Sequence, residues 1–222
     1  MEVVNAGAVS LPAAADQAIR EGLAAGESFE AIVARTGRCI TAQLEVIVDA
    51  YRRLLLPPAP WYSVLMDGCL ATGRDLAQGL KYNNFGVHGA CAASAADSLA
   101  AVQRLVFETQ DVPPEALLTA LERDFVGDDE LRRQLREEAP KVGNHDDAAD
   151  GLLVTVMELF ATACEAVTDN GRGGVVRPGT GSAMYYVWLA RGHAEMREPV
   201  VGATASIGAS FSAGAYTAAS DA

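Results

Sequence analysis

The sequence predicts an α/β protein in which helices predominate. Apolar residues recur with a 3.6-residue period in the segment that begins at Phe29, and again between Leu152 and Val167, which is the pattern of helices with one buried face. Two shorter segments, residues 80–85 and 184–189, have the length and the bulky side chains of strands. Half of the 222 residues are hydrophobic, so the chain is long enough to bury the core of one domain or of two small ones.

Composition argues against several classes of function. The 29 acidic residues outnumber the 17 Lys and Arg, which gives a net charge of −12, so most of the surface would repel a phosphate backbone or an anionic membrane. No apolar run approaches the roughly 20 residues of a membrane helix, and residues 1–5 lack the basic start of a signal peptide. We therefore expect a cytoplasmic protein that binds neither nucleic acid nor membranes.

The cysteines predict free thiols rather than a metal centre or a disulfide framework. The chain contains four widely separated cysteines, Cys39, Cys69, Cys91 and Cys164. No pair has the Cys-x-x-Cys spacing, and no His lies at the usual zinc-ligand spacing from any of them. Unpaired thiols fit a reducing compartment.

Two serines mark the starts of the first two predicted helices. Ser10 precedes an Ala-rich helix that runs to about residue 22 or 26, and Ser28 caps a long helix that ends before Pro57. A serine at this position accepts a hydrogen bond from the first turn, and proline cannot continue a helix. A third helix is expected over residues 61–72, after which glycines interrupt the pattern and residues 80–85 form a short strand.

Acidic and proline signals organise the second half. Asp97 and Ser98 are interpreted as the start of a helix that ends near residue 108, and Pro113 and Pro114 open a short helix through residue 121. Two acidic, Arg-containing turns follow to residue 140, and Asp146 begins an amphipathic helix through residue 167. Residues 171–181 are expected to form a Gly-rich loop, residues 184–189 a strand, and the tail from residue 200 is small, β-branched and Gly-rich.

Several polar positions have both a structural and a functional interpretation. Cys91 and His88 follow an aromatic, Gly-rich segment, so each either faces a cavity or contributes to packing. Residues 171–174 either cradle a phosphate through backbone N–H groups or form a flexible connector, and the connector is favoured because the Walker order is missing. His145 is either a base or ligand, or part of a turn and cap before the acidic helix start, and the cap is favoured.

Several segments resemble motifs of the pyruvate formate-lyase family of glycyl radical enzymes. The matching segments are Pro58-Ala59-Pro60-Trp61-Tyr62-Ser63, Tyr82-Asn83 with Gly86, Ala96-Asp97-Ser98-Leu99, Ala139-Pro140-Lys141-Val142-Gly143-Asn144 with Asp146-Asp147, and Arg177-Pro178-Gly179 with Glu198-Pro199. The resemblance extends over nearly the whole chain. It implies that residues 1–222 are a partial domain, corresponding to the second half of the ten-stranded α/β barrel of these enzymes.

The resemblance also implies an activity for the complete enzyme. Such an enzyme would be a formate C-acetyltransferase or a glycerol or diol dehydratase-type lyase that abstracts hydrogen from a small metabolite. Its glycyl radical would be installed by an activating enzyme that carries an iron–sulfur cluster and S-adenosylmethionine, and passed to a cysteine thiyl. The partners implied are therefore the small-molecule substrate, the activating enzyme, and a complementing chain or further copies of this one.

Both motifs that carry the radical are missing from the 222 residues. The Gly-Cys-x-Glu loop is expected just before Met1, and Gly68-Cys69 does not replace it because residue 71 is alanine. The Arg-Val-x-Gly-Tyr glycyl loop is also missing, and residues 192–197 depart from the family pattern. We therefore expect no catalytic residue, no metal site and no bound cofactor in this chain, which would be inactive alone. The alternatives are a non-catalytic helical binding or scaffold protein derived from the family, and a gene fragment.

Three polar residues are the candidate substrate contacts. Tyr82, Asn83 and His88 lie in or beside the segment interpreted as a barrel strand and its exit turn. Glycines in that segment would let a ligand approach the backbone closely. Cys69, by contrast, is expected to be a buried structural thiol.

Overall fold

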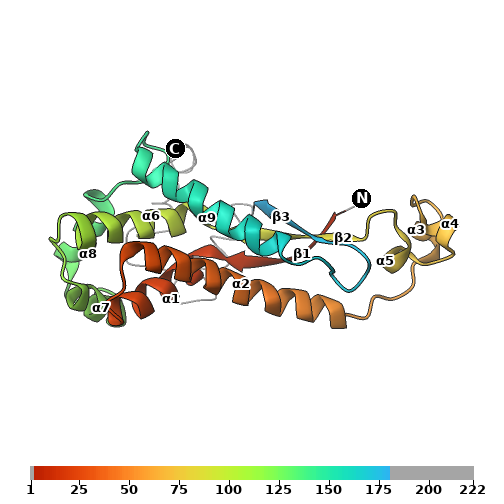
Figure 1. The fold of residues 1–222 in the computed structure, drawn as a ribbon, viewed down its shortest axis with the longest axis horizontal. Coiled ribbons are helices and arrows are strands. Elements are labelled where there is room, and N and C mark those ends of the chain that lie inside the picture. Colours follow the sequence, from red (N-terminus) through yellow and green to blue (C-terminus); the bar gives the residue numbers. More distant parts are fainter. Residues whose placement is uncertain (1–2, 181–222) are drawn as a thin grey trace.

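The computed structural model describes residues 3–180, which form an elongated α/β body in which helices predominate (Figure 1). A three-stranded parallel sheet has the order β1-β2-β3, with β1 (Val3–Ser10), β2 (Asn84–Ala90) and β3 (Val176–Thr180). The helices are α1 (Leu11–Ala24), α2 (Phe29–Arg53), α3 (Pro60–Ser63), α4 (Cys69–Thr72), α5 (Leu76–Gly79), α6 (Ala92–Val102), α7 (Pro114–Glu122), α8 (Asp129–Glu137) and α9 (Asp147–Glu165). A π-helical segment, η1 (Gln103–Glu108), continues α6.

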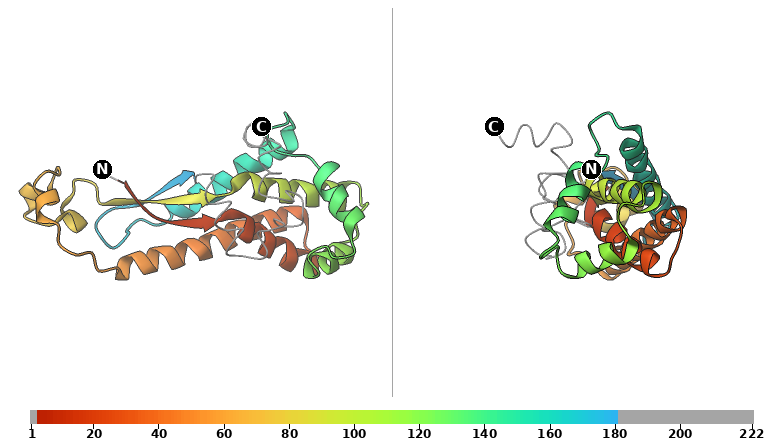
Figure 2. Two further views of the ribbon diagram at one scale, coloured as in Figure 1. Left: turned by 180° about the vertical axis from the view of Figure 1, so that it is seen from behind. Right: turned by 90° about the vertical axis from the view of Figure 1, so that its left-hand side faces the viewer.

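Four helices form the main core along the long axis of the molecule. Helix α1 packs against α2 and α6, and α9 packs against α2 and α6, while α3 to α5 lie at one end and α7 and α8 at the other (Figure 2). The largest fully buried side chains in this core include Phe85, Phe160, Ile40 and Leu99. Burying such a side chain stabilises the fold by about 1.5–3 kcal/mol, so the apolar faces of these helices hold the elements together.

Helices α2 and α9 cover one face of the sheet. The ring of Phe85 on β2 lies 4.1 Å from the ring of Tyr51 on α2, measured between centroids. Further along β2, a Cβ added at Gly89 would lie 2.9 Å from the ring of Phe160 on α9. Because side chains alternate along a strand, these odd-numbered positions face the helices and the even-numbered positions face the other way.

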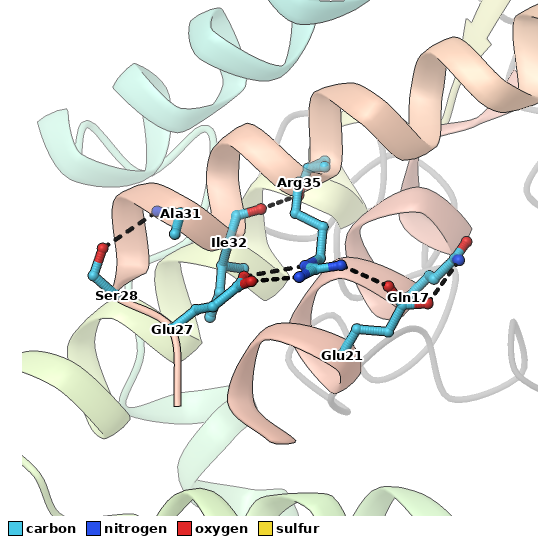
Figure 3. A network of polar contacts seen from close by, with 8 residues as sticks. Gln17, Glu21, Glu27, Ser28, Ala31, Ile32 and Arg35 are labelled. Atoms are coloured by element: carbon cyan, nitrogen blue, oxygen red, sulfur yellow. Dashed lines mark hydrogen bonds and ion pairs between the residues drawn. The ribbon is translucent and has the colours of Figure 1, made fainter. Parts of the chain in front are cut away.

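The predicted serine caps at the first two helices are confirmed. The hydroxyl of Ser10 accepts a hydrogen bond from the N–H of Ala13, and that of Ser28 accepts one from Ala31. Figure 3 shows how the two helices are also joined by charge: the Arg35 guanidinium on α2 donates to the carboxylates of Glu27 and Glu21, the second at 2.9 Å. Partly exposed pairs of this kind contribute little, typically below about 1 kcal/mol each.

Two predictions in the first half are wrong. The helix expected over residues 61–72 is divided into α3 and α4, because Gly68 has a φ of +96°, which a right-handed helix does not allow. A Cβ at this position would lie 2.6 Å from the backbone nitrogen of Lys81 and 2.8 Å from the carbonyl oxygen of Gly79. The strand expected at residues 80–85 begins later, at residue 84, and strand β1 was not predicted at all.

Two predictions in the second half are also wrong. Asp97 and Ser98 do not start a helix but are buried inside α6, which begins at Ala92. Residues 171–181 are not entirely loop, since β3 begins at Val176. The expected helices that open at Pro114 and after Asp146 are confirmed as α7 and α9. The strand expected at residues 184–189 lies outside the described residues.

Candidate functional site

His88 lies on the central strand, on the face of the sheet opposite α2 and α9. It pairs in register with Ala8 on β1 and with Gly179 on β3. A Cβ built at Gly179 would lie 3.7 Å from Cδ2 of His88, which is ordinary van der Waals contact, so the imidazole lies beside this glycine. His88 is half-buried, and among the even-numbered positions of β2 it follows Asn84 and Gly86. It is the ionisable side chain on this face of the strand.

Tyr82 and Asn83 lie before the start of the same strand. The Tyr82 ring is 46% exposed and has the Lys81 ammonium 5.5 Å from its centroid. The Asn83 side chain closes a turn, since Oδ1 accepts from the N–H of Leu80 at 3.1 Å and Nδ2 donates to the carbonyl of Gln78 at 3.3 Å. With a rise of about 3.3 Å per strand residue, His88 is roughly 16 Å further along the strand than Asn83. The three candidate residues therefore do not form one cluster.

Asn170 is a buried polar residue that sequence reasoning missed. It is fully buried, and its Nδ2 donates to the carbonyl of Asn83 at 2.6 Å. Its Oδ1 accepts from the N–H groups of Arg172 at 2.9 Å and Gly174 at 3.2 Å. The signal available in the sequence was the Asn-Gly pair at residues 170–171, which is typical of a turn.

The same bonds decide between the two interpretations of the Gly-rich segment. A phosphate loop needs free backbone N–H groups, but those of Arg172 and Gly174 are taken by Asn170, and that of Gly171 by the Asp169 carboxylate at 2.8 Å. The backbone phosphate cradle is therefore not formed. The segment is a connector that Asn170 ties to the start of β2.

The cysteines and His145 have surroundings that fit structural roles. All four cysteines are buried free thiols. Burial raises the pKa of Cys91 to about 12 and that of Cys164 to about 11, the opposite of what an activated thiol requires. His145 is exposed in the turn before α9, next to Asp146, whose carboxylate caps that helix. Within residues 3–180, no group of three or more His, Cys, Asp and Glu side chains is arranged to hold a metal ion.

Two of the family-like segments meet in the core through Asp97 and Lys141. The Asp97 carboxylate accepts a hydrogen bond from the N–H of Val142 at 2.7 Å, and the Lys141 ammonium donates to the carbonyls of Leu135 at 2.9 Å and Ala139 at 3.1 Å. Burial raises the pKa of Asp97 and lowers that of Lys141. The attraction between the two groups acts in the opposite direction, because each charge stabilises the charged form of the other. This pair ties the loop before α9 to α6, which is a structural function.

Comparison with known proteins identifies the family. A model of the family described as pyruvate formate lyase-like matches residues 27–190, more than half of the chain. This chain belongs to that family of glycyl radical enzymes. The resemblance found in the sequence motifs is thereby confirmed.

Relatives within the family show how much of it this chain represents. The chain is 32% identical over 142 residues to (2S)-3-sulfopropanediol dehydratase of Klebsiella oxytoca, which covers 62% of this chain and 17% of that enzyme. Trans-4-hydroxy-L-proline dehydratase of Clostridioides difficile is 30% identical over 104 residues, 46% of this chain and 13% of the enzyme. The chain therefore spans less than a fifth of the length of these glycyl radical enzymes.

A solved structure of the family has the same local fold. The glycerol-bound B12-independent glycerol dehydratase from Clostridium butyricum superposes with a TM-score of 0.69 at 25% identity, covering 78% of this chain and 24% of that one. This match confirms the helix-dominated α/β architecture with its small parallel sheet. Among the helices that the structure describes, none has the length and apolar character needed to cross a membrane.

Proposed function

We propose that this chain supplies part of the barrel wall of a glycyl radical enzyme of the dehydratase or lyase type, and that it has no turnover alone. The observation that supports this most directly is the parallel sheet β1-β2-β3, covered by helices α2 and α9 on one face and carrying His88 on the other. Parallel sheets are normally covered on both faces, as strands of a closed barrel are. In the proposal, the His88 face lines the substrate cavity of the second half of a ten-stranded barrel.

The kind of reaction is inferred from the relatives. They include dehydratases of sulfopropanediol and hydroxyproline, and an isethionate sulfite-lyase from Desulfovibrio desulfuricans that is 36% identical over 98 residues. These names favour a dehydratase or lyase over a formate C-acetyltransferase. The substrate proposed is accordingly a small polar metabolite from which a radical abstracts hydrogen.

The radical carriers would come from elsewhere. The 222 residues contain neither a Gly-Cys-x-Glu motif nor an Arg-Val-x-Gly-Tyr motif. In the proposal, both motifs belong to the remainder of the enzyme, in the same polypeptide or in a complementing chain, and an activating enzyme with an iron–sulfur cluster and S-adenosylmethionine installs the radical in the cytoplasm. The described residues contribute substrate contacts and the packing that supports them.

Electron paramagnetic resonance tests this proposal in two steps. The chain alone, incubated anaerobically with an activating enzyme and S-adenosylmethionine, should give no glycyl radical doublet and no product. Adding a chain that carries both radical motifs should give the doublet and dehydratase turnover. A doublet from this chain alone contradicts the proposal. So does a radical-bearing complex whose turnover is unchanged when this chain is left out.

A second candidate function, a non-catalytic binding subunit, is favoured by one specific feature. Helices α3 and α4 lie at one end of the molecule (Figure 1). In and beside these helices, the large apolar side chains of Leu55, Trp61, Leu65 and Leu70 are exposed, and we call them the apolar tip. Trp61 is 84% exposed and Leu55 is 90% exposed, and several exposed large apolar side chains in one part of a chain are typical of a docking surface.

Complementation separates the two functions, and dye binding tests whether the apolar tip is an accessible surface. A binding subunit should bind a hydrophobic fluorophore through the apolar tip, and the double variant Trp61→Ser with Leu65→Ser should abolish dye binding. Val126, which is 76% exposed at the opposite end, provides the matched control, and Val126→Ser should leave dye binding unchanged. A binding subunit should also show no radical-dependent turnover when it is mixed with a chain that carries both radical motifs. Turnover in the complemented complex rejects this second candidate.

A further inference from the structure

A cavity of about 510 Å³ lies outside the sheet face discussed above. It is formed where the end of α2 meets α5 and the loop that precedes β3, near the start of the strands. The residues that line it are Arg52, Leu54, Leu55, Leu56, Arg74, Asp75, Ala77, Gln78, Gly171 and Arg172. Neither the family assignment nor the proposed barrel-wall function uses this cavity, and it shares only Leu55 with the apolar tip.

The charge of the cavity is the reverse of the charge of the whole chain. The chain has a net charge of −12, yet three arginines line the cavity beside a single carboxylate, that of Asp75. That carboxylate is already engaged, because its Oδ2 accepts from the N–H of Ala59 at 2.8 Å and from the Ser63 hydroxyl at 2.9 Å. It holds the turn before α5 and pairs with none of the three arginines.

Two of the arginines are held in place by backbone carbonyls rather than by carboxylates. Arg172 Nη2 donates to the carbonyl of Leu54 at 2.5 Å, and the guanidinium lies 4.7 Å from the centroid of the Tyr51 ring. Arg52 Nη2 donates to the carbonyl of Asp169 at 2.5 Å. Carbonyls orient a guanidinium without cancelling its charge, so both cations stay available to an anion.

The loop geometry and the remaining guanidinium donors also leave the arginines of the cavity available to an anion. Gly171 has a φ of +80°, and a Cβ there would lie 2.7 Å from Cγ of Arg52, so only glycine lets the Arg52 stem lie against the loop. The buried Nε of Arg172 has no hydrogen-bond acceptor among residues 3–180. Arg74 is exposed, and its guanidinium makes no hydrogen bond or ion pair in the described part of the chain.

We propose that this cavity binds the phosphate group of a small molecule. Three guanidiniums beside one engaged carboxylate favour a doubly charged oxyanion, and the planar guanidinium pairs with phosphate oxygens through two parallel hydrogen bonds. The side chains of Leu54 to Leu56 line the same space and would contact the carbon portion of a phosphate monoester. The site binds through arginine side chains, unlike the backbone cradle that Asn170 prevents.

The test is calorimetric titration of the full chain at constant ionic strength, with inorganic phosphate and glycerol 3-phosphate as probes and chloride as the competing anion. We expect saturable binding at one site, and Arg74→Gln should weaken it about tenfold, which is the loss of one charged hydrogen bond. Tighter binding of glycerol 3-phosphate than of phosphate would identify an organic phosphate as the ligand, and equal affinities would identify free phosphate.

Arg53→Gln is the matched control. Arg53 is the neighbour of Arg52, its side chain is 78% exposed, it pairs with Asp49, and it does not line the cavity. The control should bind phosphate like the parent chain, and both variants should unfold like it, because neither arginine is buried. Equal weakening by the two substitutions, or no saturable binding of either probe below ~10 mM, overturns the proposal. This outcome is independent of the radical experiment, since no radical enters the measurement.

Discussion

The Asp97 carboxylate on α6 accepts a 2.7 Å hydrogen bond from the backbone N–H of Val142, which is 45 residues further along the chain. Asp97 is fully buried, and Lys141, next to its partner, is 9% exposed. Removing charges from water is costly, so a carboxylate at this position depends on the few groups that face it. Within residues 3–180 these are the Val142 N–H, the Lys141 ammonium, and the like charge of Asp150.

The first prediction concerns the pH dependence of stability. Burial raises the pKa of Asp97 from 3.8 to about 7, so the folded chain holds this proton more tightly than the unfolded chain does. The Asp97 contribution to the free energy of unfolding is therefore largest below pH 3.8 and falls as the pH rises to about 7. Asp97→Asn keeps the acceptor for Val142 and should remove this decline, which a shift of about three pKa units makes on the order of 4 kcal/mol between these limits.

Urea unfolding at a series of pH values measures this difference. The free energy of the variant relative to the parent should increase from pH 4 to pH 7. Asp150→Asn is the control on the same network, since it removes only the like charge and should shift the decline of the parent to lower pH. Parallel pH profiles for the parent and Asp97→Asn would contradict the assignment.

A second prediction concerns Asn170. Asn170→Ala removes the donor to the carbonyl of Asn83 and the acceptor shared by Arg172 and Gly174. Leaving buried backbone groups without partners should lower the free energy of unfolding by about 2–3 kcal/mol. Asp169 is an exposed neighbour whose side chain, among residues 3–180, accepts only from Gly171, so Asp169→Ala should cost less than about 1 kcal/mol. Equal costs in urea unfolding would show that the loop is held by other contacts.

A third prediction compares two glycines. Gly89→Ala places a methyl group 2.9 Å from Phe160 and 3.1 Å from Leu11, so overpacking should destabilise the chain by about 1–3 kcal/mol. In contrast, Gly151 lies in α9 with nothing within 4 Å of an added Cβ, and Gly151→Ala should stabilise it by about 0.5–1 kcal/mol. Thermal unfolding of both variants checks the sign, and a stable Gly89→Ala would mean that α9 moves freely on the sheet.

The sequence predicts those parts of the fold that local chemistry determines. Ser10 and Ser28 bond to groups three residues away, so their caps can be recognised without knowing the rest of the fold. Strand β1 could not be recognised, because Ser10 pairs with Ala90 through contacts that sequence pattern does not reveal. Asp97 was misinterpreted as a cap for the same reason, since its partner Val142 is distant in sequence.

The candidate site was predictable to a similar degree. Glycines and aromatic residues correctly indicated that the region of Tyr82 to Ala90 contains a strand, and alternation along that strand fixes the face of His88. The separation of His88 from Asn83 depends on where the strand begins, which the sequence did not define. The arginine cavity combines Arg52 with Arg172 through the packing of α2 against a distant loop, which no local motif indicates.

The last prediction separates His88 from Asn83. Asn83 closes the turn with Leu80 and Gln78, so Asn83→Ala should lower the free energy of unfolding by about 1–2 kcal/mol in the isolated chain. His88 is half-buried on the face away from α2 and α9, so in a complemented, radical-bearing enzyme His88→Ala should reduce turnover at least tenfold while the radical signal persists. Cys69→Ser, which alters a buried thiol, should lower stability and leave turnover per radical unchanged. If His88→Ala leaves turnover per radical unchanged, the assignment of His88 to the substrate cavity is wrong, although the family assignment would stand.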